Sequence, residues 1–146
     1  MPNWCNNKLA VHGPEAEICR FREQARGYEP WHHVREQDEN ILNFHSLVPV
    51  PPEVLSAGYE AAGFVWELAH WGCSHGAFEV ELADESPGRL TFVFVTPWTP
   101  PLAFLTCLAR DWPTLLFLLD YEEMSMGLKG IAKARDTGIE HHRLSL

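Results

Sequence analysis

The opening of the chain alternates polar and apolar positions, then changes to a helical period. Residues 3–12 place an apolar or small side chain at nearly every second position until Gly13, which predicts a strand. Pro14 suits the first turn of a helix, and residues 14–27 predict that helix. Its buried face is expected to hold the apolar side chains that recur every three or four positions: Ile18, Phe21 and Ala25.

Residues 28–58 interrupt this regular pattern. They begin with a charged stretch and end with a proline cluster at residues 48–52, and prolines cannot join the interior of a sheet. We therefore expect an inserted loop, held to the core by its few apolar side chains: Leu42, Phe44, Leu47 and Val48.

The rest of the chain predicts two more helices and five more strands. Residues 59–70 predict a helix that packs through Ala62, Val65, Trp66 and Ala69. In residues 78–82, Phe78, Val80 and Leu82 alternate with Glu79 and Glu81, which predicts one apolar and one acidic face. Residues 90–95 form the second strand of that hairpin and are apolar on both faces, so this strand should lie nearer the middle of the sheet. A helix at residues 100–112, a strand at 115–122 and a hairpin at 128–135 and 139–144 complete the prediction.

This order of elements predicts an α+β fold, a ferredoxin-like βαββαβ antiparallel sheet. A Pro-rich insertion plus an extra helix follow the first helix, and a C-terminal β-hairpin extends the fold. We expect a single domain over residues 1–146, with residues 28–58 as the inserted loop and residues 128–146 as the terminal hairpin. Helices should cover one face of the sheet. The other face is open unless the insertion, the terminal hairpin or a second subunit covers it, so a homodimer through the open sheet face is one expected arrangement.

Charge changes the picture of possible partners. The 146 residues carry a net charge of -9, which disfavours nucleic acid as a partner. Residues 129–146 hold four cations and two anions, so their net charge is +2 and that of residues 1–128 is -11. Four widely spaced cysteines, no secretory signal and an apolar run of only residues 115–119 predict a cytoplasmic protein with reduced thiols and no membrane association.

Several strings in the chain resemble a known family. The chain begins Met-Pro-Asn-Trp-Cys-Asn-Asn, and four further strings follow in order: residues 43–51, Trp71-Gly72, residues 96–101, and residues 121–123 followed by Met126-Gly127. Together they resemble the YubB ferredoxin-like domain family, which is found on plasmids, phages and genomic islands and has no established function. The resemblance implies a ferredoxin-like fold without an iron-sulfur cluster. The chain departs from the family pattern at residues 73–76, where a lysine and a tryptophan are replaced, so a family function that uses those two residues is in doubt here.

Residues 70–75 also suggest a metal site as an alternative. His70, Cys73 and His75 supply nitrogen and sulfur donors that zinc prefers, and Cys5, His45 or water could complete the set. The spacing is unconventional, and ordinary polar residues at a corner between helix and strand explain it as well. A metal-dependent enzyme or small-ligand-binding protein that uses these three residues is therefore kept as the alternative to our main prediction, which has no cofactor and no catalytic residue.

Single-stranded nucleic acid on the open sheet face is the second alternative. RNA-recognition domains stack bases on aromatic side chains of that face. The closest segment here is residues 89–94, but its aromatics, Phe92 and Phe94, are one position out of phase, which should turn them toward the helices.

The remaining candidates are aromatic and acidic residues near strand ends. Tryptophan and tyrosine are frequent binding anchors, and carboxylates suit a basic partner. We expect a binding surface formed by Trp4, Trp71, Trp98, Tyr121, Glu122, Glu79 and Glu81. The sequence thus predicts a non-enzymatic protein-binding accessory domain of a mobile genetic element, with an acidic inhibitor of a host defence or DNA-processing protein as one version.

Overall fold

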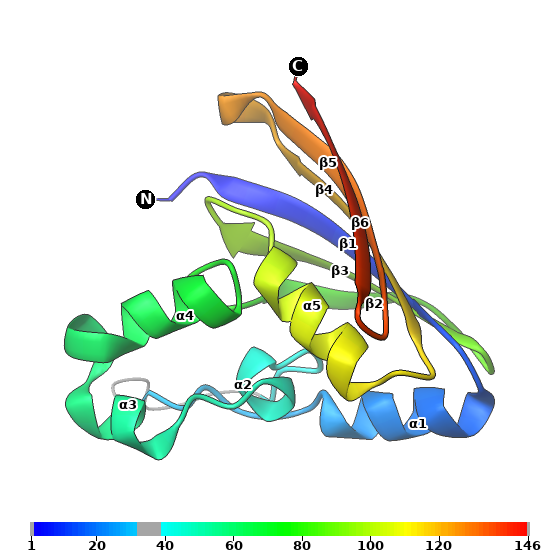
Figure 1. The fold of residues 1–146 in the computed structure, drawn as a ribbon, viewed down its shortest axis with the longest axis horizontal. Coiled ribbons are helices and arrows are strands. Elements are labelled where there is room, and N and C mark those ends of the chain that lie inside the picture. Colours follow the sequence, from blue (N-terminus) through cyan, green and yellow to red (C-terminus); the bar gives the residue numbers. More distant parts are fainter. Residues whose placement is uncertain (1, 32–38, 146) are drawn as a thin grey trace.

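Residues 2–31 and 39–145, the part of the chain that the computed structural model describes, form a six-stranded antiparallel sheet with helices on one side (Figure 1). The strands are β1 Trp4–His12, β2 Phe78–Ser86, β3 Arg89–Pro97, β4 Leu116–Glu123, β5 Leu128–Arg135 and β6 Gly138–Ser145. The helices are α1 Glu15–Gln24, α2 Phe44–Leu47, α3 Pro52–Ala57, α4 Phe64–His70 and α5 Leu102–Asp111, with a π-helical turn η1 at Tyr59–Gly63 and a 3-10 turn η2 at Met124–Met126. No helix in these residues is long and apolar enough to cross a bilayer.

The strand order β2-β3-β1-β4-β5-β6 confirms the predicted fold class. The first four strands have the ferredoxin-like arrangement, in which β1 lies between β3 and β4, and the C-terminal hairpin adds β5 and β6 beyond β4. In the register, Leu9 lies opposite Phe92 on one side and Leu119 on the other. Because all three are buried, they form the centre of the face that the helices cover.

The insertion contributes to the core, as predicted, but it is more than a loop. Leu42, Phe44, Leu47 and Val48 are all buried, and the Phe44 ring stacks on Phe104 of α5 with a centroid distance of 3.7 Å. Part of the insertion is helical, because the Asn43 side chain accepts the Ser46 N–H and caps α2. Residues 32–38 lie outside the described part of the chain.

The packing face predicted for the second helix is only partly correct: Trp66 packs against the core, but two of the other predicted residues are exposed. Val65 is 67% exposed and Ala69 is exposed, whereas Gly63 and Glu67 are buried. The cause is η1, in which the Gly63 N–H donates to the carbonyl of Gly58, five residues back, instead of four. This extra residue in one turn changes which side chains of α4 face the core.

The predicted phase of the first hairpin strand is also wrong at its start. Phe78 is 38% exposed, whereas Val80 and Leu82 pack against the core as expected. A β-bulge lies between Phe78 and Glu81, and Glu79 within it has a φ of 52°. The inserted residue turns Phe78 to the opposite face from the one that simple alternation predicts.

The second face of the sheet is not covered by any described segment. The insertion packs with the helices, and the terminal hairpin continues the sheet edge (Figure 1). Side chains such as Val93, Leu118 and Ile131 on this open face are therefore 40%, 36% and 53% exposed.

Candidate functional site

A hollow of about 500 Å³ lies where β1 begins and β3 ends. Three aromatic side chains dominate it: Trp4, Phe78 and Trp98 are 37%, 38% and 47% exposed. The rings of Trp4 and Phe78 meet edge to face with a centroid distance of 5.3 Å. The remaining lining residues are Pro2, Ser74, His75 and Pro97. Large aromatic side chains are normally more buried than this, so the hollow, which we call the aromatic hollow, is a candidate binding site.

The backbone around the aromatic hollow is strained. Among the described residues, four non-glycine residues have a positive φ, and three of them adjoin this hollow: His75 at 65°, Glu79 at 52° and Trp98 at 66°. A non-glycine residue in this conformation costs about 1–3 kcal/mol, and such residues concentrate at functional sites. Trp98 is held in place because its N–H donates a 2.7 Å hydrogen bond to the Asn3 carbonyl.

A chain of hydrogen bonds fixes the Trp98 loop from behind. The Asn7 side-chain amide donates to Thr96 Oγ1 at 2.9 Å, and that hydroxyl donates to the Thr99 carbonyl at 2.7 Å. Thr99 Oγ1 then donates to the Gly72 carbonyl at 2.7 Å. Asn7, Gly72 and the Thr96–Thr99 turn belong to three of the strings that resemble a known family, so these strings meet in this frame although they are far apart in sequence.

His75 is positioned by a buried carboxylate. Its backbone N–H donates to Glu67 Oε1 at 2.8 Å, and its Nδ1 lies 3.2 Å from the Tyr59 hydroxyl. Glu67 Oε2 accepts the indole N–H of Trp31 at 3.1 Å. Burial raises the pKa of Glu67, while these hydrogen bonds oppose the increase. The carboxylate is therefore a structural connection between the insertion and the hollow.

The hollow continues into a longer aromatic array. From Trp4 and Phe78 the ring contacts pass to His75 at a centroid distance of 6.4 Å and on to Tyr59 at 4.8 Å. Tyr59 in turn contacts Phe64 at 6.2 Å, and Phe64 is 43% exposed. A partner seated in the hollow could therefore extend over η1 and the start of α4.

The acidic residues of β2 lie next to the hollow. Glu79 is within the bulge beside Phe78, and Glu81 lies opposite Val93 in the next row of the open face. Both are exposed, and neither is in an ion pair with another described residue. The predicted Glu122 is farther away, opposite Asn6 on the same open face. The rim of the hollow on the β2 side is thus negatively charged.

Two of the predicted binding residues belong to the core instead. Trp71 is 1% exposed and donates its indole N–H to the Val48 carbonyl at 3.0 Å. Tyr121 is 2% exposed, and its hydroxyl lies 2.7 Å from His141 Nε2. The prediction that these side chains form a surface with Trp4 and Trp98 is therefore wrong. The site also includes Phe78, which simple alternation places on the same face as Val80 and Leu82, because the sequence carries no signal of the bulge.

The predicted zinc donors do not converge. His70 is exposed with Nδ1 2.9 Å from the Trp66 carbonyl, Cys73 is fully buried, and His75 contacts Tyr59. No group of three or more His, Cys, Asp or Glu side chains within residues 2–31 and 39–145 is arranged to hold a metal ion. The spacing of these three residues in sequence is therefore not matched by their placement in the fold.

The buried thiols are poor nucleophiles. Burial raises the pKa of Cys5 to about 11, and burial also raises that of Cys73, with Glu67 adding to the increase. A thiol attacks as its thiolate, so both cysteines stay protonated at neutral pH.

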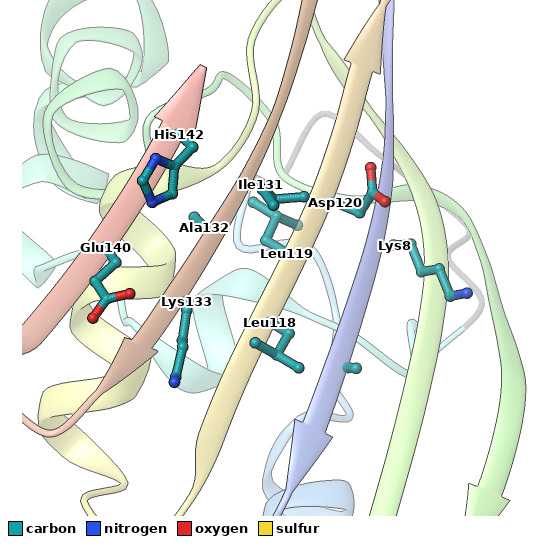
Figure 2. Close-up of a pocket in the computed structure, with 10 residues that line it drawn as sticks. Lys8, Leu118, Leu119, Asp120, Ile131, Ala132, Lys133, Glu140 and His142 are labelled. Carbon is teal, nitrogen blue, oxygen red and sulfur yellow. The ribbon is translucent and has the colours of Figure 1, made fainter. Parts of the chain in front are cut away.

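The open face carries a second concavity, a trough of about 420 Å³ across β1, β4, β5 and β6 (Figure 2). Leu118 and Ile131 form its apolar floor, and charged side chains surround them: Lys8, Asp120, Lys133 and Glu140, together with His142. Phe92 and Phe94 are 0% and 1% exposed, which confirms that they face the helices and offer no stacking surface here. The mixed charges around the trough also differ from the basic groove that a nucleic acid prefers.

Comparison with known proteins supports the C-terminal part of this fold directly. Residues 77–143 match the family model described as the ferredoxin-like domain in Api92-like protein. The structure is similar to the crystal structure of protein Api92 from Yersinia pseudotuberculosis, with a TM-score of 0.72 and 9% sequence identity over 100% of this chain and 98% of that chain. No curated protein matches. The family model carries the Api92 name rather than the YubB name that the motifs suggested. Residues 77–143 are therefore similar to the ferredoxin-like domain in Api92-like protein, and the chain as a whole is similar in fold to Api92.

Proposed function

We propose that this protein is a non-enzymatic recognition domain that binds a protein partner through the aromatic hollow. The observation that carries the proposal is the exposure of Trp4, Phe78 and Trp98 on a strained and hydrogen-bonded frame. Exposed aromatic side chains on a rigid support bind with little loss of conformational freedom, and Trp and Tyr are among the residues that contribute most to protein interfaces.

The surroundings of the hollow favour a basic segment of the partner. Glu79 and Glu81 lie beside the aromatic rings, and residues 1–128 carry a net charge of -11. An Arg or Lys side chain could stack on an indole ring and meet a carboxylate in the same site. An aromatic array that continues from His75 through Tyr59 to Phe64 suits an extended segment better than a small molecule.

The YubB resemblance supports a narrower form of this proposal. In that form the chain is an accessory protein of a plasmid, phage or genomic island and acts in the cytoplasm. Its carboxylates would occupy a basic groove of a host defence or DNA-processing protein, in the place of phosphates. The protonated state of Cys5 and Cys73 agrees with a role in binding rather than nucleophilic catalysis.

Site-specific photo-crosslinking tests the proposal. A benzophenone amino acid replaces Phe78 in the hollow, and in a matched control it replaces Met124, which is 65% exposed outside the hollow. After irradiation in host extract, we expect a discrete crosslinked protein from position 78 only. The second substitution Trp98→Ala should reduce the yield at position 78 at least about tenfold if the ring is an anchor.

Two results would contradict the proposal. One is the same set of crosslinked proteins from positions 78 and 124. The other is a product at position 78 whose yield does not change in the Trp98→Ala variant. Salt supplies a further check, because contacts with Glu79 and Glu81 should weaken as ionic strength increases.

A further inference from the structure

The two edges of the sheet differ in how they are protected. β2 forms one edge and has two irregularities in its register, together with a high density of carboxylates: Glu79, Glu81, Asp84 and Glu85. Bulges and charges of one sign are common ways to prevent an edge from pairing with another strand. β6 forms the other edge and has neither feature.

The β6 edge is regular and open. It pairs with β5 over eight consecutive residues without a bulge, and every side chain from residue 138 to residue 144 is exposed. Tyr121 of β4 fixes its register by reaching over Gly130 to His141 Nε2. A long, regular and exposed edge strand is a template for pairing with another strand.

The charge distribution favours a second copy of this chain as the occupant. Most of the molecule repels another copy, because residues 1–128 carry a net charge of -11, whereas residues 129–146 carry +2. Among two-fold contacts, in which the same surface of each copy meets, the β5–β6 hairpin is therefore the region where the two copies repel each other least.

The sequence of β6 is complementary to itself in one antiparallel register. Residues directly opposite each other in an antiparallel pair have their side chains on the same face of the sheet. In a two-fold dimer the two opposite residues are therefore an even number of positions apart in the sequence, and the axis passes through a residue and not between two residues. An axis at Glu140 or Arg143 places like charges opposite each other. An axis at His141 places Glu140 of each copy opposite His142 of the other. It also places Arg143 of each copy opposite Ile139 of the other.

We propose that the chain forms a two-fold dimer in which the β6 strands of two copies pair antiparallel about His141. The proposal does not depend on the aromatic hollow, which is at another part of the molecule. Glu140 and His142 line the outer wall of the trough in Figure 2. Pairing at β6 makes that wall the centre of a continuous sheet, so the second copy extends the trough.

Charge exchange tests the register. Sedimentation velocity from about 1 μM to about 500 μM should show a concentration-dependent dimer in the wild-type protein, in the range of weak interfaces. Glu140→Lys should weaken it about threefold to tenfold, and Glu140→Lys with His142→Glu should restore it. Both variants place the same lysine beside Lys133 of β5, so this contact within the subunit is the same in the two proteins.

Disulfide trapping gives an independent measurement. In a Cys19→Ser background, which removes the exposed native thiol, Glu140→Cys with His142→Cys should form a covalent dimer under mild oxidation. Each cysteine variant alone should form markedly less.

A wild-type protein that stays monomeric over the whole range, without trapping, overturns the proposal. So does a dimer that is insensitive to charge exchange at β6 but is lost in Leu118→Asp, because that result would assign the interface to the open sheet face.

Discussion

The backbone N–H of His75 donates a 2.8 Å hydrogen bond to Oε1 of Glu67, whose side chain has no exposed surface. The other oxygen of the same carboxylate accepts the indole N–H of Trp31. One buried glutamate thus connects the insertion to the aromatic hollow. It occupies a buried position of α4, where an amphipathic helix normally has an apolar side chain.

Glu67→Ala should therefore destabilise the protein by about 2–4 kcal/mol, because it leaves two buried donors without an acceptor and creates a cavity. Glu60→Ala is the matched control on η1, since Glu60 is exposed, and should change stability by less than about 0.5 kcal/mol. Urea denaturation followed by tryptophan fluorescence measures both. Equal stabilities of the two variants would show that the buried carboxylate is not important for folding.

The stability should also depend on pH through Glu29. Burial, followed by repulsion from Glu67, raises the pKa of Glu29 from 4.5 to about 7. The folded state therefore holds a proton that the unfolded state releases between these values. The stabilisation is complete below pH 4.5 and is lost as the pH increases through about 7.

We expect the free energy of unfolding of the wild-type protein to include a decrease of about 1–3 kcal/mol from this group between pH 5 and pH 8. Glu29→Gln should remove that contribution and be more stable than wild type at pH 8. Denaturation curves of both proteins at the two pH values give the difference. An unchanged pH dependence in Glu29→Gln would show that this carboxyl is not the group that titrates.

The elements that bury only one face could be predicted from the sequence. β1, α1 and α5 each carry a simple apolar period, and the residues predicted to be buried on α1, such as Ile18 and Phe21, are buried. The hairpin at β2 and β3 was also predicted, with β3 nearer the centre of the sheet. In each case local periodicity and tertiary burial require the same face.

Two inserted residues could not be predicted. The π turn η1 and the bulge at Glu79 each shift the phase of the side chains by one position. Gly58 precedes η1 and Gly63 ends it, but neither glycine by itself indicates an extra residue, and the bulge contains no glycine or proline. As a result, Glu67 was not recognised as buried and Phe78 was not recognised as exposed. Trp4 and Trp98 were predicted as surface residues from their type, but their meeting with Phe78 depends on the bulge.

Gly72 is required by its surroundings as well as by its backbone conformation. Its φ is 86°, and an added Cβ would lie 3.1 Å from the backbone nitrogens of Leu102 and Ala103. Gly72→Ala should lower the free energy of unfolding by about 2–4 kcal/mol, because the start of α5 cannot move away freely.

Gly58→Ala is the control, since Gly58 has a φ of 99° but nothing lies within 4 Å of the added atom. We expect about 1 kcal/mol there, from the conformation alone. Thermal or urea unfolding of the pair separates the two causes, and equal losses would contradict the role of the close approach.

Thr96 should control the aromatic hollow through its hydroxyl. The hydroxyl accepts from Asn7 and donates to Thr99 in a position with no exposed surface. Thr96→Val keeps the shape but leaves a buried amide donor and a carbonyl with one partner fewer, which should cost about 1–3 kcal/mol. Thr106→Val on the exposed side of α5 is the control and should be nearly neutral, because the Thr106 hydroxyl donates only to the Leu102 carbonyl of its own helix.

Thr96→Val should also change the Trp98 loop, because Thr99 directly follows Trp98 in the sequence. We expect tryptophan to become more accessible to a fluorescence quencher under conditions where the variant is still folded. A folded Thr96→Val protein with the quenching of wild type would show that the Trp98 loop does not need this hydrogen bond.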